Sequence, residues 1–266
     1  MITVLPMPDS ARPTVAITGA GGALGQALLR QWHRRGARLI ALTSRPGGLE
    51  VCAEADPEEG SMALRQVCWR TGGESDLAPL LREVDVLVIN HGVNVHGRHD
   101  AEAVRASLEV NALSGLRLLE LFAEQVRQRR ADPATAGRPL PEVWVNTSEA
   151  EVQPALSPAY EISKRLLGQL VSLRALELAG TVRIRRLVLG PFRSSLNPIG
   201  VMGADWVAAQ ILRQAGWGWN LIIVTINPLT YVTMPLTALG RWLYFRVLSE
   251  RSGGVAPGER IRSRAR

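Results

Sequence analysis

A short apolar run that ends in a glycine-rich loop and leads straight into a helical pattern limits this chain more than any other feature. The run is TVAITGA, residues 14–20, and the loop TGAGGALG extends from Thr18 to Gly25. Glycines in such a turn let the backbone bend tightly and let a pyrophosphate approach the N–H groups of a helix N-terminus. An ordinary glycine-rich turn is the alternative, but the order of strand, loop and helix favours a dinucleotide-binding α/β domain.

Apolar runs and helical patterns alternate along the rest of the chain, as they do in parallel sheets built from βαβ units. Six further strands are predicted at 38–45, 64–70, 84–92, 143–148, 183–190 and 220–226. Long helices are predicted over 100–130 and 157–180. The length of 266 residues suits one large domain, and no linker interrupts the strands. We therefore expect an α/β fold with one doubly wound, mostly parallel seven-stranded sheet.

The boundaries of this domain follow from where the pattern begins and ends. The expected dinucleotide-binding catalytic domain is 14–228, after an N-terminal tail, 1–13, and before a C-terminal extension, 229–266. Within the domain, 46–63 is expected to hold a loop and a helix, and 131–141 a surface loop. Ligands of doubly wound sheets bind at the carboxyl ends of the strands, so we expect the site there.

Each glycine of the loop has an expected role in holding the dinucleotide. Gly19 would make the turn, Gly21 or Gly22 would allow close approach of the pyrophosphate, and Gly25 would let the helix pack closely on the strand. The expected cofactor contacts of the loop are Thr18, Gly19, Gly21, Gly22, Leu24 and Gly25.

The end of the second predicted strand indicates which dinucleotide is bound. An acidic residue there would bond the ribose 2′-hydroxyl of NAD, whereas a basic residue accommodates the 2′-phosphate of NADP. This chain has Ser44 and Arg45 at that place and no acidic residue nearby. NADP(H) is therefore the expected cofactor. NAD(H) is the alternative, because a single arginine carries little weight in an arginine-rich chain.

Lysine is almost absent from the sequence. Of the 31 basic residues 30 are arginine, and the single lysine, Lys164, follows Tyr160, one of only three tyrosines, by four positions. The two residues share one face of the predicted helix. Tyrosine acts as an acid or base near neutral pH only when a cation stabilises its phenolate, and an ammonium can exchange its proton whereas a guanidinium cannot. The pattern therefore predicts an acid–base pair.

With these motifs the sequence resembles the short-chain dehydrogenase/reductase family over most of 14–228. The glycine loop is similar to the family's T-G-x-x-G-x-x-G loop, and INHG at Ile89 to Gly92 resembles its Asn-Asn-Ala-Gly element. LGPFRS resembles the family's Pro-Gly segment after the sixth strand. The resemblance implies a Rossmann fold with catalytic residues Asn111, Ser148, Tyr160 and Lys164. It also implies cofactor contacts at Asn90, Gly92, Tyr160, Lys164, Gly190 and Ser194.

The resemblance further implies an NADP-dependent oxidoreductase that interconverts a carbonyl and an alcohol. Tyr160 would exchange the proton of the substrate oxygen while hydride moves to or from nicotinamide. Lys164 would hold the nicotinamide ribose and lower the pKa of Tyr160. Ser148 would hydrogen-bond the substrate oxygen, and Asn111 would anchor a water in the proton relay.

The sequence departs from the family pattern in three places. Ser148 precedes Tyr160 by 12 residues, one fewer than is commonest, and the acidic Glu149 follows it. Glu149 either reflects a shortened loop or alters the substrate that is taken. The acid that usually contacts adenine after the third strand is not evident, since Asp76 is a poor positional match. His91 stands within the INHG element.

The histidines do not indicate a metal site. Three of them, His91, His96 and His99, fall within nine residues, but their spacing matches no zinc template. We therefore expect no bound metal. His91 is instead expected to line the nicotinamide pocket.

The C-terminal extension is apolar and unusually poor in charge. Residues 214–240 are 27 positions without a charged side chain, yet Pro228 and Pro235 argue against a membrane-spanning helix. A helix over 235–248 would carry aromatic residues beside arginines, which suits a membrane interface. The alternative is that these aromatics cover the substrate pocket or a subunit interface, which leaves a homo-oligomer open. Family members with extended apolar C-termini often act on lipids or steroids, so the resemblance implies a lipophilic substrate.

Charge and cysteine content restrict the possible partners and the cellular compartment of the protein. The net charge is +7, but the last 16 residues contribute five arginines and one glutamate to it, so the body is nearly balanced and a nucleic-acid partner is not expected. Cys52 and Cys68 show no disulfide or metal spacing, and the first residues form no secretory signal. These features indicate a cytoplasmic protein, with peripheral contact to the cytoplasmic membrane face as a further expectation.

Two other functions compete with the oxidoreductase. A non-catalytic NADP(H)-binding sensor or scaffold would share the fold, but it would not need the intact set of Asn111, Ser148, Tyr160 and Lys164. A nucleotide-sugar epimerase of the family's longer branch would need additional residues for its substrate domain, and the sequence does not contain them. We therefore expect an enzyme.

Overall fold

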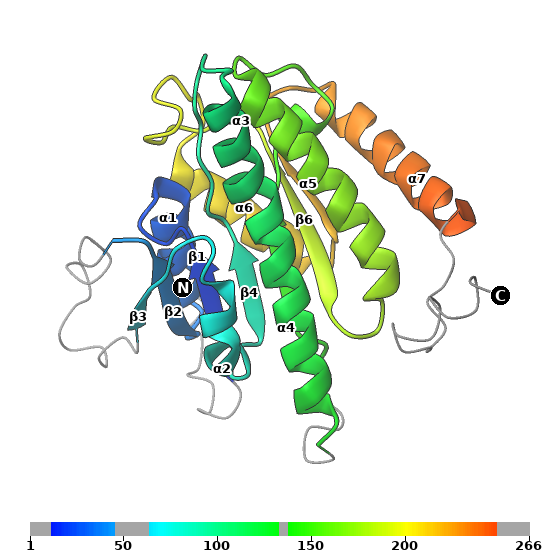
Figure 1. Cartoon of the computed structure of the whole chain (residues 1–266). Helices are drawn as coiled ribbons and strands as arrows, with labels where there is room; N and C mark the ends of the chain where they lie inside the picture. Colours follow the sequence, from blue (N-terminus) through cyan, green and yellow to red (C-terminus); the bar gives the residue numbers. More distant parts are fainter. Residues whose placement is uncertain (1–11, 46–63, 133–137, 249–266) are drawn as a thin grey trace.

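The computed structural model of the chain describes residues 12–45, 64–132 and 138–248 (Figure 1). Most of the expected N-terminal tail, the predicted loop and helix at 46–63, which includes Cys52, and the basic tail after residue 248 lie outside the described residues. The predicted surface loop at 131–141 is described only at its two ends.

Seven parallel strands form one sheet in the order β3-β2-β1-β4-β5-β6-β7, which confirms the predicted fold class. The strands are β1 Thr14–Thr18, β2 Arg38–Thr43, β3 Leu64–Cys68, β4 Val86–Ile89, β5 Glu142–Asn146, β6 Arg183–Leu189 and β7 Leu221–Val224. β1 and β4, near the centre of the sheet, are buried along their whole length because both faces of the sheet are covered. β1 pairs with β2 on one side and with β4 on the other, so the strand order reverses beside β1. A doubly wound sheet binds its ligand at this reversal.

Helices cover both faces of the sheet (Figure 1). α1, Ala23–His33, and α6, Ala204–Gly216, pack on one face around Leu28 and Ile211. α2 Ala78–Leu81, α4 Ser114–Arg130 and α5 Pro158–Glu177 pack on the other face. The prediction named no helix over Ala204–Gly216, although its buried residues follow a helical period.

The long helix predicted over 100–130 is interrupted. α3, Ala101–Leu108, begins at the cap Asp100, whose side chain accepts a hydrogen bond from the backbone of Ala103 at 3.0 Å. A π-helical turn, Glu109–Leu113, follows and leads into α4. Such turns are rare and often mark functional sites. This turn contains the predicted catalytic residue Asn111.

The C-terminal helix begins earlier than predicted. α7 spans Thr230–Leu248 and runs through Pro235, whereas the sequence was expected to become helical only at that proline. Proline removes one backbone donor, but it lies only one turn beyond the first residues of the helix, which are held by a hydrogen bond of 2.9 Å from Thr233 Oγ1 to Leu229 O. α7 lies beside α5 at the β7 edge of the sheet (Figure 1) and buries Met234 against Val188 and Ile223. Within the described chain, we find no helix long and apolar enough to cross a membrane.

Candidate active site

The glycine loop lies at the carboxyl end of β1 and is shaped by two close approaches. Gly19 has a φ of +61°, and a Cβ on it would lie 2.9 Å from the Cα of His91. A Cβ on Gly25 would collide with the carbonyl oxygen of Gly19 and lie 2.7 Å from the Cα of Ala20. Both positions therefore require glycine. Gly22 caps α1 in an extended conformation, so the free N–H groups of the first helical turn face the carboxyl edge.

Replacing Gly25 by alanine is expected to displace this loop. The added methyl group has no room between helix and strand, so NADPH should bind at least about tenfold more weakly, as a titration of NADPH fluorescence would measure. Gly216→Ala is the matched control, because a Cβ there meets no atom within 4 Å. Equal affinity in Gly25→Ala and wild type would show that the close packing does not shape the cofactor site.

Ser44 and Arg45 follow β2 beside the glycine loop, and both are exposed. Ala20 N donates to Leu42 O at 3.2 Å, which ties the loop to the end of β2. Leu24 is buried beneath the loop in the core on the α1 side of the sheet. The arrangement leaves the Arg45 side chain free to meet an anionic group at this edge.

Thr18 is the last residue of β1, and its contact with the cofactor stays a prediction. Its side chain is buried, and its hydroxyl accepts hydrogen bonds from the backbone N–H groups of Asn90 (2.9 Å) and His91 (3.2 Å). The same hydroxyl lies 3.3 Å from Val88 O and 2.9 Å from His91 Nδ1, and its one proton can be given to either. Thr18 therefore fixes the segment that follows β4.

Asn90 and Gly92 lie where the prediction put them, between the glycine loop and the end of β5. Asn90 Oδ1 accepts a hydrogen bond of 2.8 Å from Asn146 Nδ2, and Asn90 Nδ2 lies 3.5 Å from Gly19 O. A Cβ on Gly92 would lie only 3.0 Å from Asn111 Oδ1. These contacts join β1, β4, β5 and the π-helical turn at one point.

The structure brings Ser148, Tyr160 and Lys164 together at this point. The Ser148 side chain lies beside the Tyr160 phenol and lowers its pKa. Lys164 Nζ donates to Asn146 O at 3.0 Å and lies 5.7 Å from the centre of the Tyr160 ring. Lys164 is only 4% exposed, so the one lysine of the chain is a buried cation beside a phenol.

Burial controls the protonation of this pair. It raises the pKa of Tyr160; the hydrogen bond from Ser148 opposes this change, and the negative charge of Glu149 adds to it. Burial also lowers the pKa of Lys164 to about 8, against the opposing effect of Glu151. At neutral pH Tyr160 therefore holds its proton, and most Lys164 is charged. This state can donate a proton to a neighbouring oxygen.

Asn111 braces the start of the Tyr160 helix. Its Nδ2 donates to Val93 O at 2.9 Å and to Ser163 Oγ at 3.0 Å, and Ser163 Oγ in turn donates to Tyr160 O at 2.7 Å. Its Oδ1 accepts from Val93 N at 2.7 Å. Both amide donors are used, so a water held by Asn111 would have to be bound by one of its oxygens. The water-anchoring role stays a prediction.

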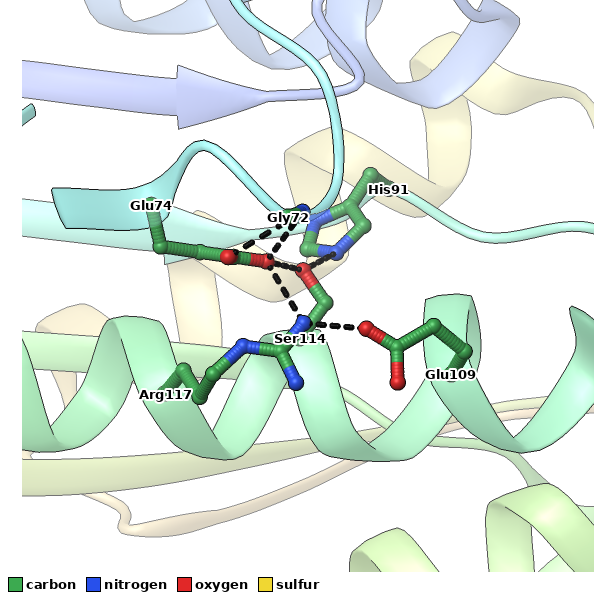
Figure 2. Close-up of polar contacts among 6 residues, drawn as sticks. All are labelled: Gly72, Glu74, His91, Glu109, Ser114 and Arg117. Atoms are coloured by element: carbon green, nitrogen blue, oxygen red, sulfur yellow. Dashed lines mark hydrogen bonds and ion pairs between the residues drawn. The ribbon is translucent and has the colours of Figure 1, made fainter. Parts of the chain in front are cut away.

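The His91 ring is held by contacts within the protein, and its place in the nicotinamide pocket stays a prediction. Its two ring nitrogens lie 2.9 Å from Thr18 Oγ1 and 3.1 Å from Ser114 Oγ, so the ring is tied between two protein hydroxyls (Figure 2). The ring also meets Trp69 edge-on, with ring centres 5.0 Å apart. Burial lowers the pKa of His91 to about 4, which keeps the imidazole neutral. His91 is thus part of the support of the site.

Glu74 anchors this support and was missed in the sequence. Ser114 Oγ donates to Glu74 Oε1 at 2.6 Å, and Arg117 Nη2 donates to the same oxygen at 3.0 Å (Figure 2). Burial raises the pKa of Glu74, but hydrogen bonds from Arg117, Ser114 and Gly72 outweigh it and bring the pKa to about 2. No local motif marks Glu74, because its partners Ser114 and Arg117 are about 40 residues away in the sequence. Asp76, two positions on, is exposed.

The described histidines do not assemble a metal site. Among the residues that the structure covers, no group of His, Cys, Asp and Glu side chains has the arrangement to hold a metal ion. His96 and His99 are exposed on the loop before α3.

Gly190 and Ser194 lie after β6, at the same edge of the sheet. A Cβ on Gly190 would collide with Thr225 Oγ1, so glycine allows the end of β7 to approach closely. Ser194 Oγ accepts from Asn197 N at 3.2 Å within a tight turn. Their contact with a cofactor stays a prediction.

Comparison with known proteins identifies the family. The profile of the short chain dehydrogenases matches residues 13–198. The chain belongs to the short-chain dehydrogenase family. It is 48% identical over 238 residues to a monoglucosyldiacylglycerol epimerase of Synechocystis, covering 90% of this chain and 55% of that protein. It is 29% identical over 179 residues to mouse 17-beta-hydroxysteroid dehydrogenase type 1, covering 62% of this chain and 48% of that protein. The chain thus spans about half the length of these curated relatives.

Solved structures share the fold at low sequence identity. A short-chain dehydrogenase from Sphingobium yanoikuyae in complex with NADPH has a TM-score of 0.71 at 18% identity, covering 92% of this chain and 99% of that chain. One from Burkholderia cenocepacia in complex with NADP has a TM-score of 0.68 at 20% identity, covering 90% of this chain and 98% of that chain.

Proposed function

We propose that this chain is an NADP(H)-dependent oxidoreductase that interconverts an alcohol and a carbonyl on a lipid-linked substrate, with Tyr160 as acid and base. The observation that carries the proposal is the buried ammonium of Lys164, 5.7 Å from the centre of the Tyr160 ring, with the Ser148 side chain beside the Tyr160 phenol. A sensor protein on the same fold would have no use for this arrangement.

Tyr160, Ser148 and Lys164 have different roles around one substrate oxygen. When bound, the nicotinamide supplies or accepts the hydride. In the reductive direction Tyr160 gives its proton to the carbonyl oxygen. Ser148 turns its hydroxyl from its long contact with Leu189 O, at 3.5 Å, to the same oxygen. The charge of Lys164 stabilises the phenolate that remains. In the oxidative direction the phenolate takes the proton back.

Several residues fit the dinucleotide. The N–H groups at the start of α1 would bind the pyrophosphate, Lys164 would bind the nicotinamide ribose, and Ser44 with Arg45 would bind a 2′-phosphate. The preference for NADP(H) over NAD(H) rests on Arg45. Solved structures that share the fold and contain NADP or NADPH are consistent with this preference.

Replacing Arg45 by aspartate is expected to reverse the cofactor preference. Loss of the cation and gain of an anion should weaken NADPH binding at least about tenfold and leave NADH binding equal or tighter. Dissociation constants for both nucleotides measure this. Arg34→Asp makes the same charge change at the other end of α1 and should leave the ratio as it is. An unchanged ratio in Arg45→Asp would remove the structural basis for the preference.

The rim of the proposed site is apolar, which favours a lipophilic substrate. Five large apolar side chains in the loops at the carboxyl edge are 58–92% exposed: Leu156, Ile199, Val201, Ile226 and Leu229. Exposed apolar side chains gathered at one edge usually mark a binding surface. Together with the similarity to the glycolipid epimerase, they lead us to propose a lipid whose head group carries the reacting hydroxyl or carbonyl.

Epimerisation of a glycolipid is the second candidate, because it is the reaction named for the relative that shares 48% identity. An oxidoreductase can invert a hydroxyl-bearing carbon by removing hydride from it, which leaves a ketone, and returning hydride to the opposite face. The cofactor then ends in the state in which it began. The sequence argues only against an epimerase of nucleotide sugars, because such an enzyme needs an additional substrate domain. A lipid-linked sugar does not need a domain that binds a nucleotide.

One experiment separates these functions. Purified protein would be given monoglucosyldiacylglycerol in detergent micelles with NADP⁺, and separately NADPH with ketones and aldehydes of graded lipophilicity, always beside Tyr160→Phe. A dehydrogenase or reductase changes the absorbance of the nicotinamide in step with product. An epimerase yields an inverted hexose without net change in the nicotinamide. NADP(H) binding without any Tyr160-dependent product would favour the sensor and end our proposal.

The exposed face of α7 leads us to propose that the protein contacts an anionic membrane, where its lipid substrate would reside. The large apolar side chains on this face are Val232, Leu236, Leu239, Leu243 and Val247. Trp242 carries Arg246 over its ring at 4.9 Å, and no acidic residue occurs between Asp205 and Glu250. Apolar and aromatic residues beside cations are typical of interfacial helices.

Leu239→Gln and Leu243→Gln are expected to weaken binding to phosphatidylglycerol-containing vesicles roughly several-fold each, since each removes apolar surface from the contact. Vesicle flotation measures this, with Leu140→Gln, in the loop before β5, as the control. Equal flotation of all variants and wild type would rule out contact through α7.

A further inference from the structure

Helix α7 holds the segment that joins Ser148 to the helix of Tyr160. Three alternate side chains of this segment contact α7, each at hydrogen-bond distance. The contacts are Thr230 Oγ1 to Glu149 Oε2 (3.3 Å), Arg241 Nη1 to Glu151 Oε2 (2.5 Å) and Gln153 Nε2 to Thr233 Oγ1 (3.4 Å). Residues some 80 to 90 positions apart in sequence thus meet at the segment that directly follows the proposed catalytic serine.

The ion pair between Glu151 and Arg241 is the strongest of these contacts. The Glu151 side chain is fully buried and that of Arg241 is 9% exposed. Arg186 approaches the same carboxylate at 3.9 Å and donates to Gly168 O at 3.1 Å. Removing one partner of a buried pair leaves an uncompensated charge, which is strongly destabilising. α7 is therefore firmly attached at Arg241.

A glycine on α5 makes room for the pair. A Cβ on Gly168 would overlap the Glu151 carboxylate and lie 2.9 Å from Arg241 Nη1. Tyr160, Lys164 and Gly168 follow each other at intervals of four, so they share one face of α5. The ion pair thus lies one helical turn beyond Lys164, on the face that carries the proposed acid–base pair.

Ser148 and Glu151 belong to one short turn. Glu149–Glu151 form a 3₁₀ turn in which Glu151 N donates to Ser148 O at 3.0 Å and Ala150 N donates to Ser148 Oγ at 3.2 Å. Glu149 fixes the outer side of the turn, since its Oε2 accepts from Thr225 Oγ1 at 2.6 Å. A displacement of the Glu151 side chain would therefore move the Ser148 hydroxyl.

We propose that α7 is a positioning element of the catalytic centre: through Arg241 and Glu151 it holds the Ser148 turn against Tyr160 and Lys164. The inference rests on the proposed function, because it assumes that Ser148 and Tyr160 act on the substrate. It assigns to Arg241 a role in turnover although this residue touches none of the proposed catalytic side chains. It also means that deleting α7 would disturb the active site and any membrane contact at once.

Two substitutions disturb the junction from different elements. Arg241→Met removes the cation from α7, and Gly168→Ala inserts a methyl group from α5. Each is expected to lower kcat at least about tenfold at a temperature where the variant is folded, because small displacements of catalytic groups reduce turnover strongly. The dissociation constant of NADPH should stay within about twofold, since the glycine loop is not part of the junction.

The conservative variant and a remote control separate positioning from mere stability. Arg241→Lys keeps the charge and should restore kcat to within about threefold of wild type. Arg213→Met, which removes an exposed arginine stacked on Trp217, should leave kcat and KM as they are. If Arg241→Met does not fold, the double variant Glu151→Ala, Arg241→Ala removes both charges together and is expected to show the same loss of kcat.

The assay would use NADPH with the carbonyl compound that the wild type reduces fastest, and it would include Tyr160→Phe. If Tyr160→Phe turns over like wild type, the proposed function itself is wrong. If Tyr160→Phe is inactive but the junction variants keep kcat within about twofold and lose only thermal stability, then α7 merely stabilises the fold and the positioning role is overturned.

Discussion

Replacing Tyr160 by phenylalanine is expected to lower kcat about 10²- to 10⁴-fold, the usual contribution of a positioned acid or base. The variant keeps the ring and loses only the hydroxyl, which lies beside Ser148. NADPH affinity should therefore stay within about threefold of wild type. Single-turnover oxidation of NADPH measures the chemical step.

Tyr244→Phe is the matched control, because this hydroxyl belongs to an exposed residue of α7. It should turn over as wild type does. If Tyr160→Phe and Tyr244→Phe both retained full activity, the proton would have to come from another group, and the assignment of the acid would fail.

Replacing Lys164 by arginine is expected to lower kcat about 100-fold, although the charge is kept. The larger guanidinium does not fit a position that is 4% exposed and bonded to Asn146 O, and it does not exchange a proton near neutral pH. At a surface position the same substitution should leave kcat unchanged, because this chain uses arginine for 30 of its 31 basic residues. Steady-state kinetics with NADPH measure it.

The pH profile gives a second readout for Lys164. Burial lowers its pKa to about 8, so the wild-type ammonium loses its proton as the pH rises through that value. The rate of carbonyl reduction should then fall, since a neutral amine no longer stabilises the phenolate. In Lys164→Arg the residual activity should not show this decrease near pH 8. A kcat in the arginine variant within about threefold of wild type would contradict the account of the single lysine.

The sheet was predictable from the sequence because buried parallel strands are continuous apolar runs. Val86–Ile89 and Arg183–Leu189 lie within the predicted strands, which extended beyond them by a few residues. The helices were less predictable. No residue of the sequence was read as a sign of the π-helical turn at Asn111, and Pro235 was taken as the start of a helix that in fact passes through it.

The candidate site was predictable where its residues are near in sequence or follow adjacent strands. Tyr160 and Lys164 meet because four positions make one helical turn, and Ser148 joins them because it follows β5 at the carboxyl edge. The supports were not predictable. Glu74 and Arg241 find their partners only after the helices have packed, and no local pattern records a contact across 40 or 90 residues.

In the proposed reaction Tyr160 assists hydride transfer between nicotinamide and a substrate carbon. The most direct measurement uses NADPH with deuterium at both C4 positions of the nicotinamide and mass spectrometry of the product formed from the carbonyl panel. The account predicts one deuterium on the carbinol carbon of the product, formed by wild type and almost lost in Tyr160→Phe. A product without deuterium at that carbon, or equal deuterium transfer by the two proteins, would contradict it.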